Sequence, residues 1–114
     1  IAMKYLHTMV RITDINQSLQ FYCDGLGLQE VRRSDYEKGR FTLIFLAAPE
    51  DMAFANQINP PLLELTYNWD SENYTSGRNF GHLAFSVQNI YETCDHLESM
   101  GIEILRPPRD GRMA

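Results

Sequence analysis

The stretch HTMVRITDINQSLQFYCDGLGL, residues 7–28, decides the fold because a related stretch follows it in the chain. HLAFSVQNIYETCDHLESMGI, residues 82–102, begins 75 residues later, and the correspondence places His7 on His82. Each copy starts with side chains that alternate in polarity, as in a strand, and continues with apolar residues at helical spacing. The sequence therefore predicts an internal repeat of a strand, a helix and a second strand.

The ends of both helices carry recognisable signals. Asp14 is a candidate N-cap for the first helix, which we expect to end around Gly25 and Gly27. Asn89 is the corresponding cap of the second helix, which we expect to stop at Gly101.

The first copy continues into three strands. We expect a short strand near Leu28–Arg32, a strand at FTLIFLA (41–47) and a strand at PPLLELTYNW (60–69), which completes a βαβββ module over residues 4–69. The second module begins in residues 79–114, and its last strands are absent by the logic of the repeat. We expect a single α+β domain, 1–114, of paired βαβββ modules forming a half-closed barrel, with the second module truncated. Residues 1–3 look like a tag remnant followed by a start.

Composition narrows the class of protein. The 114 residues carry a net charge of -5, which argues against nucleic acid or an anionic membrane surface as a partner. No apolar run has the length of a membrane span, and no secretory leader is recognisable. Cys23 and Cys94 lack metal-type spacing and are too few for a disulfide framework. We therefore expect a cytoplasmic protein with reduced thiols.

Three residues suggest chemistry. His7 and His82 occupy equivalent points of the repeat, and Glu64 interrupts an apolar strand, where a carboxylate is rarely buried without a partner. Taken singly, each residue is better explained as an ordinary surface or hydrogen-bonded side chain. Taken together, they indicate a site of two histidines and one carboxylate, a donor set that suits Zn, Ni, Co or Fe(II).

Several motifs in order resemble glyoxalase I (lactoylglutathione lyase), of the vicinal oxygen chelate superfamily. They are LHTMVRITDINQSLQFYCDGLGL, LELTYNW and GRNFGHLAFSV, and the similarity spans Lys4 to Met113. The resemblance implies that His7, Glu64 and His82 are three of four metal ligands. The fourth would be a glutamate on the last strand of the second module, which this sequence lacks.

The resemblance also implies a reaction and an assembly. The substrate would be the hemithioacetal of glutathione and methylglyoxal, isomerised to S-lactoylglutathione at a homodimer interface, with Glu64 as a catalytic group that moves a proton. Arg11, Asn68 and Arg78 would bind glutathione, with Arg112 near its glycyl end, because Arg recognises carboxylates well. Ni²⁺ is favoured over Zn²⁺, with Co²⁺ also compatible. A chain that ends at Ala114 would be nearly inactive.

Two other functions stay open. An extradiol dioxygenase would use the same ligands to hold Fe(II), would not need the arginine and asparagine set, and would consume oxygen with a catechol. A metal-free dimer that sequesters a drug or another small molecule would bind ligand stoichiometrically without metal.

Overall fold

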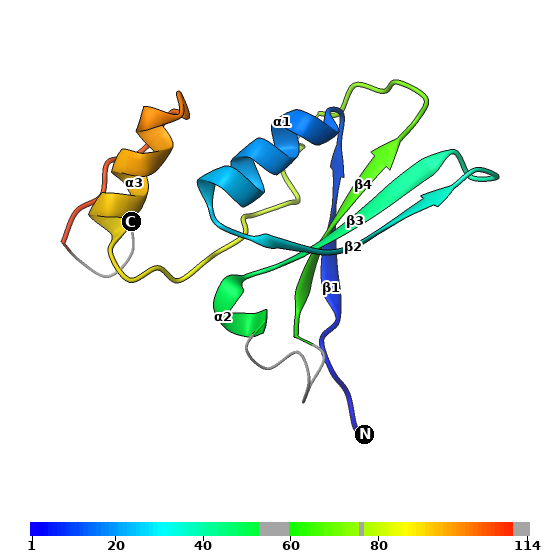
Figure 1. Ribbon diagram of the computed structural model, residues 1–114, viewed down its shortest axis with the longest axis horizontal. Helices are drawn as coiled ribbons and strands as arrows, with labels where there is room; N and C mark the ends of the chain where they lie inside the picture. Colours follow the sequence, from blue (N-terminus) through cyan, green and yellow to red (C-terminus); the bar gives the residue numbers. More distant parts are fainter. Residues whose placement is uncertain (53–59, 76, 111–114) are drawn as a thin grey trace. The chain divides into compact units, whose positions relative to one another are not determined.

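The structure is a computed structural model that describes residues 1–52, 60–75 and 77–110. The chain divides into two compact units, Ile1–Tyr74 and Thr75–Ala114, and each is described by itself. Figure 1 shows the course of the chain, coloured from the N-terminus to the C-terminus.

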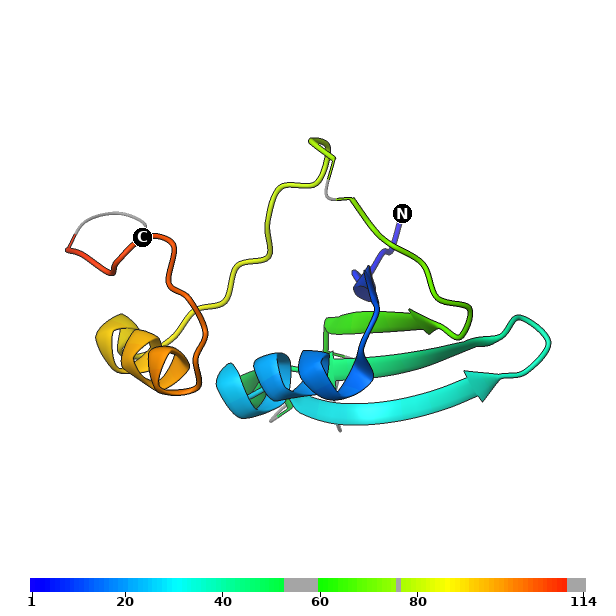
Figure 2. The same ribbon diagram turned by 90° about the horizontal axis from the view of Figure 1, so that it is seen from above.

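The first unit is one βαβββ module. Its elements in chain order are β1 (His7–Ile12), α1 (Ile15–Leu19), the π-helix η1 (Gln20–Gly25), β2 (Gln29–Tyr36), β3 (Phe41–Ala47), α2 (Pro49–Met52) and β4 (Leu62–Asn68). The sheet has the order β1-β4-β3-β2, with β1 parallel to β4 and the other pairs antiparallel. Figure 2 shows β3 between β4 and β2. The predicted order of elements in the first repeat is therefore confirmed.

The two faces of this sheet carry different residues. On one face, Ile44, Leu46 and Leu65 are completely buried and form the core. On the other face, which we call the site face, β1 presents exposed His7 and Arg11. Successive side chains of a strand point to opposite faces, so alternate residues of β4 lie in the core and on the site face.

The first helix begins as predicted and then changes type. The Asp14 side chain accepts a hydrogen bond from the Gln17 backbone N–H at 2.9 Å, which caps α1. After Leu19 the segment continues as the π-helix η1 and ends at Gly25, so the predicted end is confirmed while a purely α-helical course is wrong. Gly27 follows at φ 84°, a left-handed conformation that favours glycine.

The second strand is longer than expected. It runs over Gln29–Tyr36 rather than Leu28–Arg32, and its register against β3 shifts between Glu30 and Arg32. A β-bulge of this kind redirects the side chains that follow it. It places Arg32 opposite Phe45, on the site face.

The second unit contains the helix α3, Ile90–Ser99. Asn89 caps it by accepting hydrogen bonds from the backbone N–H groups of Tyr91 and Glu92, as the sequence predicted. The strands predicted from His82 and at IEIL (102–105) are wrong, because no described residue after Asn68 is paired in a sheet. A strand requires a neighbour for its backbone groups, and this unit supplies none among its described residues. A paired second module thus stays a prediction.

None of the helices in the described ranges has the length and apolar content that a membrane crossing requires.

Candidate active site

His7 and Glu64 meet on the site face. In the parallel pairing of β1 with β4, Met9 lies opposite Glu64, so His7 reaches the carboxylate diagonally. His7 Nε2 lies 3.3 Å from Glu64 Oε1, and the glutamate is only 9% exposed while the histidine faces solvent. Two ligand atoms that each bind one metal ion at about 2.1 Å lie roughly 3.0 to 3.4 Å apart. The pair therefore fits two adjacent positions of a divalent metal site.

The two oxygens of Glu64 have different neighbours. Oε1 faces His7, whereas Oε2 accepts a hydrogen bond from the Thr66 hydroxyl at 3.1 Å. Thr66 is itself buried and lies two residues along the same strand, on the same face. The carboxylate is thus buried with a partner on each oxygen, which explains how a glutamate is tolerated inside an apolar strand.

An aromatic ring fixes the other side of the histidine. The His7 and Phe45 rings meet edge to face with centroids 5.6 Å apart, and the guanidinium carbon of Arg32 lies 4.0 Å from the centroid of the Phe45 ring. Arg32 and Phe45 were not predicted as site residues. The sequence pattern of β2 carries no signal for the bulge that places Arg32 here.

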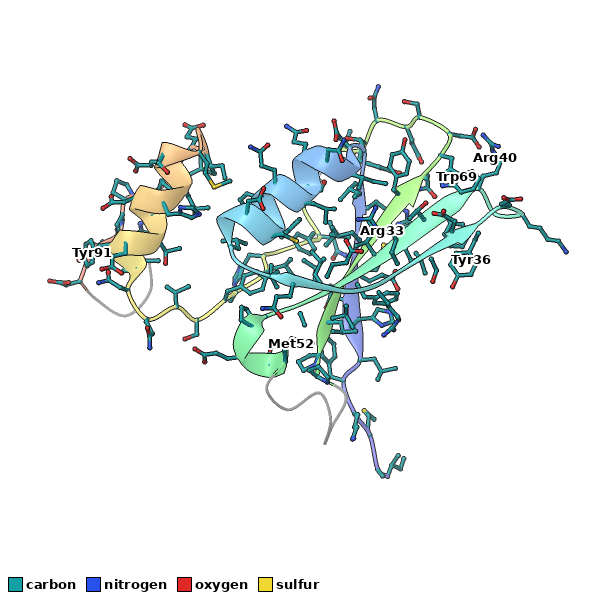
Figure 3. The ribbon with its side chains drawn as sticks, in the orientation of Figure 1. Arg33, Tyr36, Arg40, Met52, Trp69 and Tyr91 are labelled. Atoms are coloured by element: carbon teal, nitrogen blue, oxygen red, sulfur yellow. The ribbon has the colours of Figure 1, made fainter. Side chains whose placement is uncertain are left out.

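A pocket of about 320 Å³ adjoins His7 at the start of β1 and β4. Its wall includes Met52 of α2, which Figure 3 labels. The lining residues are Leu6, His7, Val31, Arg32, Met52, Pro60 and Leu62. The pocket therefore combines aliphatic walls with one imidazole and one guanidinium.

The opposite ends of the same strands carry two of the predicted glutathione-binding residues. Arg11 is exposed near the end of β1, and Asn68 is the last residue of β4. The Asn68 Nδ2 group donates a hydrogen bond to the Tyr74 hydroxyl at 2.8 Å. This contact orients the amide at the edge of a small polar hollow that Thr13 and Glu72 also line.

Trp69 has a structural role at the end of β4. Its indole N–H donates to the Thr42 hydroxyl at 2.9 Å, and Thr42 donates in turn to Asp35 at 2.7 Å. Beside it, Arg40 makes two hydrogen bonds to Asp70, at 3.0 and 3.1 Å, which lower the pKa of that carboxyl. Figure 3 labels both Arg40 and Trp69 near the turn between β2 and β3.

The remaining predicted site residues belong to the second unit. Arg78 and His82 are exposed within it, and Arg112 lies outside the described residues. Across the described ranges, no group of three His, Cys, Asp or Glu side chains gathers at one point. The structure thus brings His7 and Glu64 together and adds no third ligand from the residues it describes.

Comparison with known proteins identifies the family. Residues 4–114 match the model of the glyoxalase/bleomycin resistance protein/dioxygenase superfamily. The chain is 42% identical over 106 residues to a probable lactoylglutathione lyase of Synechocystis sp., a match that covers 93% of this chain and 76% of that protein. This chain belongs to the glyoxalase I family.

Two further matches agree with membership of the glyoxalase I family. The lactoylglutathione lyase of Neisseria meningitidis is 39% identical over 104 residues, which are 91% of this chain and 71% of that protein. The structure of the trypanothione-dependent glyoxalase I of Leishmania major superimposes with a TM-score of 0.80 at 29% identity, covering 95% of this chain and 73% of that one. The α+β glyoxalase fold, seen here as one βαβββ module, is confirmed.

Proposed function

We propose that this protein is a lactoylglutathione lyase, which isomerises the hemithioacetal of glutathione and methylglyoxal to S-lactoylglutathione. The observation that carries the proposal is the contact of His7 Nε2 with Glu64 Oε1, 3.3 Å apart on the site face of a chain from the glyoxalase I family. The reaction moves a proton from the carbon that bears sulfur to its neighbour, without net oxidation. It therefore detoxifies methylglyoxal without a redox cofactor.

We propose His7, Glu64 and His82 as metal ligands. Imidazole and carboxylate donors suit Ni²⁺, Co²⁺ and Zn²⁺, and we favour Ni²⁺ as proposed from the sequence. When bound, the divalent ion would act as a Lewis acid for the negative charge that develops on the substrate oxygen. The burial of Glu64 supports this assignment. A charged carboxylate that is buried without a partner is destabilising, and a bound cation provides that partner.

The protein residues would orient the substrate and move its proton. Glu64 is the proposed catalytic carboxylate, since its Oε1 lies 3.3 Å from Nε2 of His7, a side chain that is open to solvent. Arg11, Asn68 and Arg78 would hold the carboxylates of glutathione, with Arg112 as a further contact. The Tyr74 hydroxyl, which accepts from Asn68 Nδ2, supports the assignment of Asn68 because it fixes the direction of the amide.

We further propose a homodimer, in which the second unit of one chain completes the site of its partner. The first unit supplies a histidine and a carboxylate, while His82 and Arg78 belong to the second unit. An assembly of this kind would bring the proposed ligands of two chains together. The expectation of a nearly inactive chain is not borne out, since the relatives that this chain matches are lactoylglutathione lyases.

Metal replacement tests the proposed function. The protein is stripped with a chelator, reloaded separately with Ni²⁺, Co²⁺ and Zn²⁺, and assayed for thioester formation from the hemithioacetal. We expect at least one metal to restore turnover, with Ni²⁺ the most effective. A protein that binds these metals and turns over no hemithioacetal would contradict the proposal. Oxygen uptake with a catechol and Fe(II) would favour the dioxygenase, and ligand binding without metal would favour the binding protein.

The hydroxyl of Thr66 provides a second test. Replacing Thr66 by valine removes the donor to Glu64 Oε2 but keeps the branched shape of the side chain. We expect metal affinity to fall about tenfold, as is typical when the partner of a ligating carboxylate is removed. Competition with a chelating dye measures the dissociation constant, and Thr66→Ser should restore it.

Thr42→Val is the matched control for this change. Thr42 is buried on the adjacent strand β3, and its hydroxyl contacts Asp35 and Trp69 rather than Glu64. Both valine variants lose a buried hydroxyl, so both should unfold more readily, by about 1 kcal/mol. Only Thr66→Val should lose metal affinity. Equal metal affinity in the two variants would show that Thr66 does not orient the ligand.

A further inference from the structure

We propose that the pocket beside His7 receives the aldehyde-derived part of the substrate, and that Arg32 makes the enzyme favour 2-oxoaldehydes whose side chain ends in an anion. This inference rests on the proposed function. It assigns Arg32 a role in specificity, separate from the residues proposed to hold glutathione and metal.

The direction of β1 and β4 indicates where the glutathione part and the aldehyde-derived part of the substrate would bind. Since β1 and β4 run parallel, their starts lie at one edge of the sheet and their ends at the other. Arg11 follows His7 by four residues, and Asn68 follows Glu64 by four, which is about 13 Å along a strand. If glutathione is held at the strand ends, its sulfur points back toward His7 and Glu64. The group beyond the reacting carbon then continues toward the strand starts.

The pocket lies at those strand starts. His7, the first residue of β1, lines it together with the preceding residue Leu6. Leu62, the first residue of β4, lines it together with Pro60. Its volume of about 320 Å³ is far more than the methyl group of methylglyoxal needs. Small-molecule pockets begin at about 300 Å³, so a substituent of the size of an aromatic ring is accommodated.

Arg32 gives this pocket its charge. Its guanidinium lies over the face of Phe45, 4.0 Å from the ring centroid, which limits the orientations of the planar group. Among the described residues it has no carboxylate partner, whereas the next residue, Arg33, pairs with Glu30 at 2.6 Å. A guanidinium that is held by an aromatic ring and lines a pocket is well prepared to bind a carboxylate or phosphate.

An exposed arginine on a sheet face can also be a solvated charge without function. The stacking on Phe45 and the place of Arg32 in the pocket wall favour the binding role, since the same Phe45 ring also contacts His7. The pocket charge therefore lies close to the proposed reaction site. Because Arg32 is exposed, we expect a moderate preference for anions rather than an absolute requirement.

A matched pair of substrates tests the inference. Phenylglyoxal and 4-carboxyphenylglyoxal differ by one carboxylate, and kcat/KM is measured for the glutathione hemithioacetal of each with the metal-loaded protein. We expect the unmodified protein to favour the carboxylated substrate by roughly 5- to 10-fold. Arg32→Gln should bring this ratio close to one, and Arg32→Lys should keep most of it because the charge remains.

Arg33→Gln is the control, since it removes a charge next in sequence whose guanidinium is engaged by Glu30. The ratio should stay unchanged in this variant. A ratio that does not respond to Arg32→Gln, or that falls equally in Arg33→Gln, would overturn the inference.

Methylglyoxal turnover in the same proteins separates this inference from the proposed function. If the unmodified protein isomerises methylglyoxal but shows no charge preference, the inference alone fails. If it isomerises neither type of hemithioacetal, the proposed function fails with it. If Arg32→Gln loses all turnover, the inference is tested instead by the salt dependence of the kcat/KM ratio in the unmodified protein. A charge contact with an exposed group weakens as salt is added, so the ratio should fall. A ratio independent of salt would then overturn the inference.

Discussion

Replacing Glu64 by glutamine is expected to abolish tight metal binding and to lower turnover by about 100- to 1,000-fold. The amide has nearly the same shape, and its oxygen can still accept from the Thr66 hydroxyl, so the strand keeps its local contacts. It carries no negative charge, however, and it cannot accept a proton from the substrate. Metal titration and initial rates with saturating metal measure the two losses separately.

Glu30→Gln is the control for this substitution. Glu30 is an exposed carboxylate of the same sheet, and it pairs with Arg33 rather than with His7. We expect unchanged metal affinity and turnover in that variant, because exposed ion pairs contribute little. If Glu64→Gln bound Ni²⁺ as tightly as the unmodified protein, Glu64 would not be a ligand.

The contact between His7 and Glu64 shows which features of the site the sequence can predict and which it cannot. The repeat singled out His7, and an interrupted apolar strand singled out Glu64, but neither signal contains a distance. Their 3.3 Å approach depends on the parallel pairing of β1 with β4, two strands that are far apart in the chain. Pairing register arises from long-range packing, so residue types could be predicted while their geometry could not.

Other features escaped prediction for local reasons. The bulge between Glu30 and Arg32 adds one residue without any glycine or proline to mark it, and it moves Arg32 to the site face. The change from α1 to η1 is likewise unmarked, because neither a proline nor a glycine occurs between Ile15 and Asp24. The residues from His82 alternate in polarity as in a strand, but they are not paired in a sheet. Alternation shows that a segment can form a strand, and it does not show that a neighbouring strand is available.

Replacing Leu65 by alanine is expected to lower the free energy of unfolding by about 2 to 5 kcal/mol. Leu65 is completely buried, and it lies between Val10 of β1 and Ile44 of β3 in the sheet register. The loss combines the burial of three carbon atoms with the cavity that remains among side chains from three strands. Denaturant unfolding, with the midpoint and slope compared at equal protein concentration, measures this loss.

Leu105→Ala deletes the same atoms from a side chain that is 88% exposed, and it should change the free energy of unfolding by less than about 0.5 kcal/mol. Equal destabilisation by the two substitutions would contradict the assignment of Leu65 to the core.

Leu65→Ala and Glu64→Gln together test whether one strand serves both stability and chemistry. The two residues are adjacent on β4 and point to opposite faces of the sheet. We expect Leu65→Ala to unfold readily while its folded fraction still binds metal, and added metal should recover part of the lost stability because it binds only the folded form. Glu64→Gln should show the reverse, with a stable fold that gains nothing from metal. If both variants lost stability and metal response to the same extent, the core and the site face of β4 would not be separable.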